Sequence, residues 1–247
     1  MRLALLGGGA MGKLVGALAR DAGWEVGRVV TSREAGLSAG ELAGLLRGHD
    51  AAIDFSAAEA VVRNVGACVE AGVPLVEGTT GWLGQLEEAR RAVEAGGGAL
   101  VYGANFSVGV NLFYRLVARA AELFAAAGYE TFVEEAHHSR KRDAPSGTAL
   151  RLRELLACEF GEGFSVSSTR AGHIPGTHRV GFDGPADQVT LTHTARTREG
   201  FAAGALAAAS FIRGRRGVYE FSESLEEILR AGAGAPPAAG PRGGGEI

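Results

Sequence analysis

The segment from Glu135 to Thr148 concentrates side chains that can bind an anion and move a proton. It reads Glu-Ala-His-His-Ser-Arg-Lys-Arg-Asp-Ala-Pro-Ser-Gly-Thr. Histidine side chains in general can donate or accept protons near neutral pH, so the adjacent His137 and His138 are candidates for moving a proton. Lys141 lies between two arginines that raise the local positive potential. The final Ser-Gly-Thr turn precedes an expected helix, whose first N–H groups can hold a carboxylate. The pattern favours a site for a dianion with a proton donor beside it.

Two other interpretations of this segment stay open at this point. A basic surface turn would carry the same charges without binding a ligand. Paired histidines can also ligate a metal ion. Adjacent histidines without a nearby carboxylate triad form a poor ligand set, however, so we expect no metal.

A second candidate site lies near the start of the chain, where Gly7-Gly-Gly-Ala-Met-Gly12 matches the pattern Gly-x-Gly-x-x-Gly. It stands between an expected strand and an expected helix, which is the context that dinucleotide binding requires. The 39 glycines of the chain make chance matches more frequent, so a turn that only packs is the alternative. We expect the pyrophosphate of a dinucleotide to contact Gly7, Gly9, Ala10, Met11 and Gly12.

The residues after the second expected strand bear on the choice of cofactor. An acidic residue there would bind the adenosine ribose hydroxyls of NAD. This chain has Thr31, Ser32 and Arg33 instead, and a guanidinium suits a 2′-phosphate. We therefore expect NADPH to be preferred, with NADH possible. Arg33 as a solvated surface residue is one alternative, and use of Glu34 after a longer strand is another.

Two further segments follow expected strands: 78–81 after the strand at 73–76, and 103–107 after the strand at 99–102. In a doubly wound sheet, ligands bind outside the carboxyl ends of the strands. Backbone groups in these segments are placed to bind the nicotinamide carboxamide, and the Phe106 ring to pack on the nicotinamide. Ordinary turns, and a purely structural Phe55, are the alternatives. The expected cofactor contacts are Phe55, Gly78, Thr79, Thr80, Gly103, Ala104, Asn105 and Phe106.

These sites require a scaffold, and the hydrophobic pattern predicts two domains. The first is α/β, a Rossmann-type doubly wound parallel sheet with right-handed crossovers. After Asn105 the rhythm changes to a second, α+β domain with a mixed or antiparallel sheet. The expected strands are 2–6, 25–30, 51–55, 73–76, 99–102, 129–135, 164–169, 178–182 and 188–194. The expected helices are 11–22, 59–71, 83–95, 110–127, about 148–158 and 201–212. The Gly- and Pro-rich tail from about residue 231 is expected to be loose.

Composition limits the function further. The chain has 247 residues, of which 46% are hydrophobic and 21% charged, as in globular proteins. A net charge of -3 argues against nucleic-acid binding through overall charge. No apolar run suits a signal peptide or a membrane span, so a cytoplasmic protein is expected. Cys68 and Cys158 are expected to be buried free thiols.

Several motifs, in order along the chain, resemble the dihydrodipicolinate reductase (4-hydroxy-tetrahydrodipicolinate reductase) family. The segment from Glu135 to Thr148 is more specific than the glycine loop. The resemblance spans about residues 2 to 218. The matching segments are the glycine loop, Asp54-Phe-Ser56, Gly78-Thr-Thr-Gly81, Asn105-Phe-Ser-Val-Gly109, Glu135-Ala-His-His138 with Lys141, Asp143-Ala-Pro-Ser-Gly-Thr-Ala149, Arg170-Ala-Gly with Gly176-Thr-His178, and Thr192-His-Thr-Ala195 with Arg198 and Phe201-Ala-Ala-Gly204.

The resemblance implies reduction of a small cyclic dicarboxylate by NAD(P)H in diaminopimelate and lysine biosynthesis. It implies catalytic roles for His137, as proton donor, and for Lys141. It also implies a cofactor domain of 1–107 with 199–247, a substrate and oligomerisation domain of 108–198, and a homotetramer. The alternatives are another NAD(P)-dependent dehydrogenase of a small acid and a non-catalytic NAD(P) sensor. The implied substrate contacts are His138, Ser146, Gly147, Thr148 and Thr80.

Overall fold

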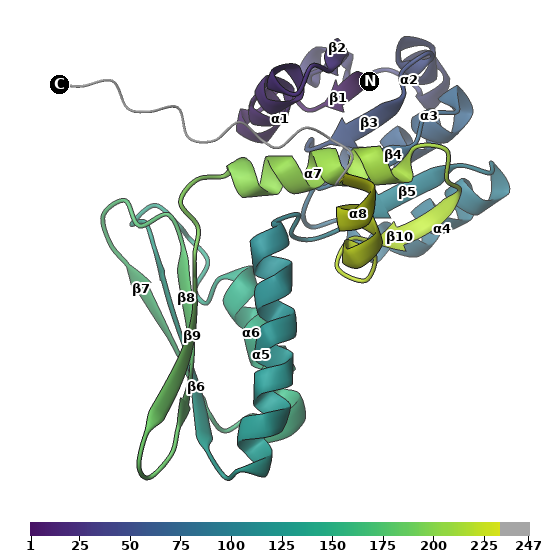
Figure 1. Cartoon of the computed structure of the whole chain (residues 1–247). Coiled ribbons are helices and arrows are strands. Elements are labelled where there is room, and N and C mark those ends of the chain that lie inside the picture. Colours follow the sequence, from purple (N-terminus) through teal and green to yellow (C-terminus); the bar gives the residue numbers. More distant parts are fainter. Residues whose placement is uncertain (233–247) are drawn as a thin grey trace. The chain divides into compact units, whose positions relative to one another are not determined.

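The computed structural model describes residues 1–232, and Figure 1 shows its helices and strands. The chain divides into two compact units. One unit comprises Met1–Ser107 and the segment from Glu199 onward, and the other comprises Val108–Arg198. Of the tail that was expected to be loose, residues 231 and 232 close the last helix, and residues 233–247 lie outside the described range.

The first unit contains a six-stranded sheet in which every pairing is parallel. Strand β1 lies in its interior, with β2 on one side and β3 on the other. The chain therefore reverses its direction of winding beside β1, and ligands of open α/β sheets bind at such a point. The order is β10-β5-β4-β3-β1-β2, formed by β1 (Arg2–Leu6), β2 (Glu25–Val30), β3 (Ala51–Asp54), β4 (Leu75–Glu77), β5 (Ala99–Tyr102) and β10 (Gly217–Glu220).

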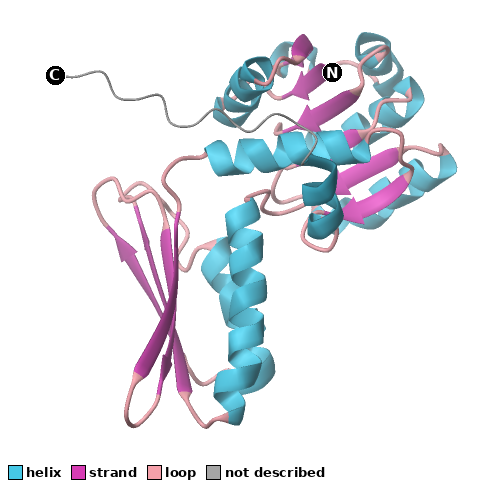
Figure 2. Ribbon diagram, viewed as in Figure 1, coloured by secondary structure: helices cyan, strands magenta, loops and turns pink. Residues whose placement is uncertain are grey.

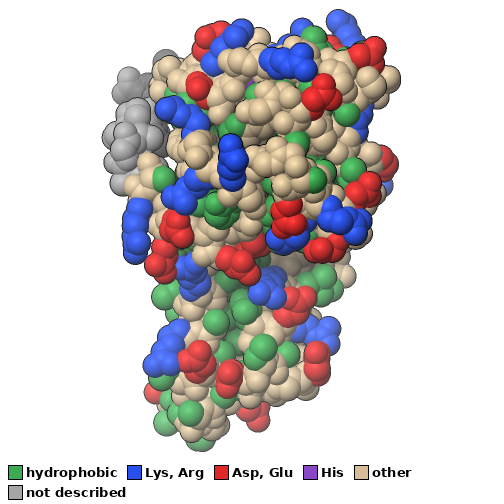
Figure 3. Space-filling model, turned by 90° about the vertical axis from the view of Figure 1, so that its right-hand side faces the viewer, with side chains coloured by type: hydrophobic (Ala, Val, Ile, Leu, Met, Phe, Trp, Pro, Cys, Tyr) green, Lys and Arg blue, Asp and Glu red, His purple; other side chains and the backbone are tan. Residues whose placement is uncertain are grey.

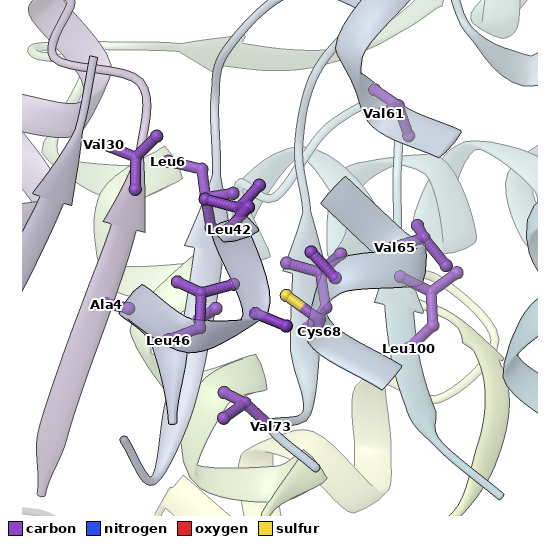
Figure 4. Close-up of a cluster of buried hydrophobic side chains, with 14 of the residues drawn as sticks. Ala4, Leu6, Val30, Leu42, Leu46, Val61, Val65, Cys68, Val73 and Leu100 are labelled. Carbon is purple, nitrogen blue, oxygen red and sulfur yellow. The ribbon is translucent and has the colours of Figure 1, made fainter. Parts of the chain in front are cut away.

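Helices cover both faces of this sheet, as β3 and β4 require because they are buried along their whole length. Helices α1 (Ala10–Asp21) and α7 (Glu199–Ile212) pack on one face, and α8 (Leu225–Gly232) packs against α7. The opposite face carries the apolar cluster shown in Figure 4, in which leucine, valine and alanine side chains of the strands meet those of the helices. The helices of that face are α2 (Ala39–Leu46), α3 (Val61–Ala71) and α4 (Leu86–Ala95).

The second unit has a four-stranded mixed sheet in the order β7-β6-β8-β9. Strands β6 and β7 are parallel, and the other two pairings are antiparallel. Helices α5 and α6 pack together and share an apolar core with the sheet. Figure 2 shows the strands in magenta beside these two helices. The elements are α5 (Val108–Ala126), β6 (Glu130–His137), α6 (Gly147–Phe160), β7 (Ser165–Arg170), β8 (Thr177–Asp183) and β9 (Gln188–Thr194).

The predicted fold class is confirmed, with differences in detail. Helices α2 and α8 and strand β10 were not predicted from the sequence. Helix α2 has only eight residues, two of them glycine, but Ser38 and Glu41 form a capping box at its start that a search for caps would find. Strand β6 runs on to His137, two residues beyond its predicted end. Both cysteines are free as expected, but Cys158 is exposed, so the prediction that it is buried was wrong.

Charged side chains of both signs are mixed over the face drawn in Figure 3, as the small net charge leads one to expect. Among residues 1–232, no helix is both long and apolar enough to cross a bilayer.

Gly204 allows the close approach of α7 to the segment after β5. A Cβ atom there would lie 1.8 Å from the Phe106 carbonyl oxygen, whereas one at Gly200, in the same helix, would lie 3.6 Å from Ser107 Oγ. We expect Gly204→Ala to lower the free energy of unfolding by about 1–3 kcal/mol, because helix or backbone must shift. Gly200→Ala is the matched control and should change it by less than about 1 kcal/mol. Thermal melts followed by circular dichroism measure both. A Gly204→Ala protein that melts at or above the wild-type temperature would contradict the packing.

Candidate active site

The glycine loop after β1 forms a tight turn that brings α1 close to the sheet. Gly7 has a φ of +103°, and a Cβ there would lie 2.5 Å from the Phe55 carbonyl oxygen. A Cβ at Gly12 would lie 1.9 Å from the Gly7 carbonyl oxygen. Any side chain at either position would push the helix away from the strand ends. These two glycines therefore set the position of the helix N-terminus.

The start of α1 is open and has no side-chain cap. Gly9 is the N-cap residue, and no side chain accepts a hydrogen bond from the first turn, which also holds no acidic residue. No heavy atom would lie within 4 Å of a Cβ on Gly9. The first-turn N–H groups, which include those of Ala10 and Met11, thus have room for an anion and attract one through the helix dipole. This loop fits the pyrophosphate of a nicotinamide dinucleotide.

In the segment after β2, the Glu34 side chain has hydrogen-bond partners, whereas the Arg33 side chain remains available to a ligand. The Glu34 carboxylate accepts hydrogen bonds from Thr31 N at 2.8 Å and Thr31 Oγ1 at 2.9 Å, and Arg28 lies 3.0 Å away. The Thr31 hydrogen bonds lower the pKa of Glu34. Arg33 is exposed, and its guanidinium has no ion-pair partner among residues 1–232. Thr31 lies beside the glycine loop, since a Cβ on Gly8 would meet its methyl group at 3.1 Å. Arg33 is therefore the free charged group of this segment.

The expected cofactor residues at the ends of β3, β4 and β5 differ in how deeply they are buried. The Phe106 ring is 2% exposed and packs on Phe221 with centroids 4.6 Å apart. This packing covers most of the ring, and the expected contact of Phe106 with the nicotinamide stays a prediction. Phe55, half-buried, meets Phe106 edge-on at 6.3 Å. Thr80 is exposed, whereas Thr79 is 9% exposed with its hydroxyl unpartnered among the described residues.

The remaining expected contacts differ in their access to solvent. Gly103 is buried, Ala104 is exposed, and the Asn105 side chain accepts a hydrogen bond from Ser107 N at 2.9 Å. Gly78 is half-buried against the Phe55 ring, which a Cβ at Gly78 would meet at 2.2 Å. Thr80 in the loop after β4 and Ala104 in the loop after β5 are therefore the expected contacts that are exposed to solvent.

In the second unit, the side chain of Glu135 is fully buried and accepts hydrogen bonds from three elements. The guanidinium of Arg170, at the end of β7, binds both carboxylate oxygens, at 2.6 and 2.9 Å. The backbone N–H of Ser146, at the start of α6, donates to Oε1 at 3.2 Å. His137 bonds to Oε2 through its Nδ1 atom. Burial by itself would raise the pKa of Glu135, but the bonds from Arg170, Ser168 and His137 prevail and lower it to about 2.

The bond to Glu135 fixes the tautomer of His137. An ionised carboxylate only accepts hydrogen bonds, so the Nδ1 atom of the imidazole carries a proton. The Nε2 atom is then the one that can gain or lose a proton during a reaction. A Cβ on Gly176 would lie 3.1 Å from Nε2, so this glycine keeps that edge of the ring uncrowded. Burial lowers the pKa of His137, while the Glu135 carboxylate opposes this shift.

His178 and Ser146 support this arrangement from the neighbouring strand and helix. Ser146 Oγ and His178 Nε2 are hydrogen-bonded at 2.9 Å, and Ser146 Oγ also accepts from Ala149 N at 3.2 Å. The rings of His137 and His178 meet edge-on with centroids 5.1 Å apart. Burial, and secondarily the charge of His137, lower the pKa of His178 to about 4. His178 is therefore neutral at neutral pH.

Glu135, Arg170 and His178 lie in the motifs that carry the family resemblance, but no role was predicted for them. One local signal was available for Glu135. It follows Thr131 and Val133 on the buried side of β6, where an acidic residue requires hydrogen-bond partners. Nothing local indicated Arg170, which is 35 positions away in the chain.

The other expected residues of this unit lie around His137. Lys141 forms an ion pair of 2.9 Å with Asp143, and its charge acts on the pKa of His137. His138 is half-buried, and its Nδ1 atom has no hydrogen-bond partner among the described residues. Gly147 is exposed at the first turn of α6, and Thr148 is hydrogen-bonded to Tyr114.

Glu135, His137 and His178 also present ligand atoms within 4.8 Å of one another. Such a group resembles part of a metal site. However, the Arg170 guanidinium binds both Glu135 oxygens, and its positive charge would repel a metal cation. The donor set thus fits an ion pair with a positioned imidazole better than it fits a metal ion.

The chain is similar to known proteins along nearly all of its length. The family described as "Dihydrodipicolinate reductase, N-terminus" matches residues 1–106, and "Dihydrodipicolinate reductase, C-terminus" matches residues 109–225. A 4-hydroxy-tetrahydrodipicolinate reductase of Anaeromyxobacter sp. (strain Fw109-5) is 38% identical over 86% of this chain and 88% of its own. That of Acinetobacter baumannii (strain AYE) is 36% identical, over 87% and 92%.

A solved structure shows the same fold. The dipicolinate-bound dihydrodipicolinate reductase from Paenisporosarcina sp. TG-14 matches with a TM-score of 0.74 and 20% identity, over 89% of this chain and 97% of its own. At that identity the likeness concerns the fold, whereas the sequence matches identify the family. The chain thus belongs to the dihydrodipicolinate reductase family.

Proposed function

We propose that this protein reduces 4-hydroxy-tetrahydrodipicolinate, or its dehydrated form dihydrodipicolinate, to tetrahydrodipicolinate in diaminopimelate and lysine biosynthesis. The names of its relatives support this substrate. The observation that carries the mechanism is the buried Glu135–His137 pair, which leaves one imidazole nitrogen to transfer a proton. We further propose that the protein prefers NADPH, accepts NADH, uses no metal, and works in the cytoplasm as a homotetramer.

His137 is the proton donor in this proposal. The bound nicotinamide supplies a hydride to the conjugated C=C–C=N system of the substrate. The carbon that becomes electron-rich must then gain a proton, which protonated Nε2 of His137 supplies. Glu135 retains its bond to the Nδ1 proton throughout and stabilises the imidazolium before transfer.

The carboxylates of the substrate bind at the start of α6 and to nearby cations. The N–H groups of Gly147 and Thr148 lie in the first turn of that helix, where an anion is favoured. Lys141 and His138 add charge and hydrogen-bonding capacity, and Lys141 is in addition a candidate proton donor. Ser146 acts differently from the sequence-based expectation. Since its N–H and hydroxyl groups are already hydrogen-bonded, we assign it to holding the turn rather than the substrate.

On the cofactor side, the pyrophosphate binds at Gly7, Gly9, Ala10, Met11 and Gly12. Arg33 binds the 2′-phosphate, which its exposed, unpaired guanidinium favours. The nicotinamide end lies along the loops after β3, β4 and β5. In these loops the proposed contacts are Phe55, Gly78, Thr79, Thr80, Gly103, Ala104, Asn105 and Phe106.

The role of His137 is tested by mixing enzyme, NADPH and freshly generated dihydrodipicolinate. We expect the wild-type protein to oxidise NADPH and His137→Gln to lower kcat by about 10²–10⁴-fold, because the proton donor is lost. The affinity for NADPH alone, measured by calorimetry, should stay within about twofold, since His137 belongs to the other unit. Exposed His173→Gln is the control and should keep its kcat. A wild-type protein that oxidises no NADPH would refute the function, and an unchanged kcat in His137→Gln would refute the role.

The role of Arg33 is tested by the ratio of kcat/KM for NADPH to that for NADH. We expect Arg33→Ala to lower kcat/KM for NADPH by about 10- to 100-fold, the effect of one lost charged hydrogen-bond partner, and to leave that for NADH nearly unchanged. Arg91→Ala, at an exposed position of α4, is the matched control. Equal losses with both cofactors would show that Arg33 does not bind the 2′-phosphate.

A further inference from the structure

Two acidic side chains in the first unit are fully buried and have no part in the mechanism above. Asp54 and Glu77 are the last residues of β3 and β4, and they face each other in register across these neighbouring strands. Both are 0% exposed. Within residues 1–232, neither forms an ion pair with a lysine, arginine or histidine. Two adjacent buried carboxylates without a cation cannot both be ionised at reasonable cost.

The surrounding donors show which of the two carboxyl groups carries a proton. Asp54 Oδ1 accepts from Ser56 N, and Oδ2 accepts from the Asn64 amide, each at 2.7 Å. Glu77 Oε1 accepts from Thr79 N at 2.7 Å, but its buried Oε2 has no donor among the described residues. As a protonated Oε2–H, this atom can donate to Asp54 instead. Asp54 is then the ionised member and Glu77 the neutral one.

Other groups near the pair agree with this assignment. Burial raises the pKa of both carboxyls. Hydrogen bonds from Ser56 and Asn64 oppose this shift at Asp54, whereas the charge of Asp54 adds to burial and raises the pKa of Glu77 well above its usual value. The facing titratable group on α3 is the buried Cys68 thiol, whose pKa burial and the two carboxyls also raise. Arg63 is linked to Asp54 through Asn64, whose Oδ1 atom it binds at 2.9 Å. The Arg63–Asn64 contact holds the amide so that its N–H group points to Asp54.

We propose that Asp54 and Glu77 share one proton and act as positioning residues for the two loops that receive the nicotinamide end of the cofactor. Asp54 holds the loop after β3 through Ser56 N, and Glu77 holds the loop after β4 through Thr79 N. The shared proton joins the two anchors, and the bond of 2.9 Å from Gly78 N to the Asp54 carbonyl oxygen joins the loops a second time. The assignment of these loops to the cofactor rests on the proposed function.

The proton on Glu77 has a definite effect on stability. The unfolded chain loses this proton near pH 4.5, and the folded chain keeps it to a higher pH. Between these two values the folded state holds more protons than the unfolded state, so the free energy of unfolding falls as the pH rises and levels off above the folded pKa. A chain with glutamine at position 77 lacks this proton and should lack this fall.

The test compares two substitutions of nearly equal shape. In Glu77→Gln the amide N–H replaces the carboxyl O–H, so we expect the Kd for NADPH to stay within about twofold. We also expect the Tm of wild type minus the Tm of this variant to decrease by several degrees as the pH rises from about 4.5. In Asp54→Asn the new side-chain N–H group faces another donor, either Ser56 N or Asn64 Nδ2, and one hydrogen bond that holds the loop is lost. The Kd for NADPH should therefore rise by about tenfold or more. Exposed Glu94→Gln, in α4, is the control and should match wild type in both readouts.

Kd is measured with NADPH alone and Tm without any ligand, so both readouts are independent of the substrate. If wild type failed to bind NADPH, the proposed function would fail, but the Tm profiles would still test the shared proton. The inference is overturned if Glu77→Gln and Asp54→Asn weaken NADPH binding equally. It is also overturned if the Tm of Glu77→Gln follows the wild-type pH dependence. If Asp54→Asn does not fold, the Tm profile of Glu77→Gln alone decides.

Discussion

The buried carboxylate of Glu135 is the constraint on which the second unit depends. An ionised group without solvent is tolerated only if its oxygens are satisfied, and removing one partner of such a group typically costs about 3–5 kcal/mol. Here the partners come from the end of β7, the start of α6 and β6 itself. Their need to meet at one carboxylate fixes the imidazole of His137 relative to the Ser-Gly-Thr turn at the start of α6. Stability and chemistry in this unit therefore rest on the same hydrogen bonds.

The first unit meets a comparable requirement by different means. Its strands end in short loops that must come close to a phosphate-bearing ligand, and glycine contacts bring them there. At the strand ends that carry these loops, Asp54 and Glu77 share one proton, which takes the place of an ion pair. In each unit, a buried acid at a strand end orders the loop beside it. The surrounding donors differ, and so does the protonation state, with Glu135 ionised and Glu77 neutral.

The sequence predicted what depends on local pattern. Buried strands such as Arg2–Leu6 and Ala99–Tyr102 are continuous apolar runs, and their bounds were predicted correctly. The glycine loop and the Ser-Gly-Thr turn were recognisable because each is a short contiguous motif at the start of a helix. Features set by distant partners were not predictable in this way. The Phe106 ring is buried by Phe221, which follows over a hundred positions later, and Glu135 is held by an arginine from another strand. The capping box of α2 was a local signal that went unused.

The central claim is that Glu135 holds the Nδ1 proton of His137 and leaves Nε2 to act. Heteronuclear NMR of the histidine side chains measures this directly, at a pH above the pKa of His137, with its signals assigned by their absence in His137→Gln. We expect a neutral ring protonated at Nδ1, with Nε2 bare. A ring protonated at Nε2 with a bare Nδ1 atom would refute the assigned tautomer, because two acceptors would then face each other at Glu135.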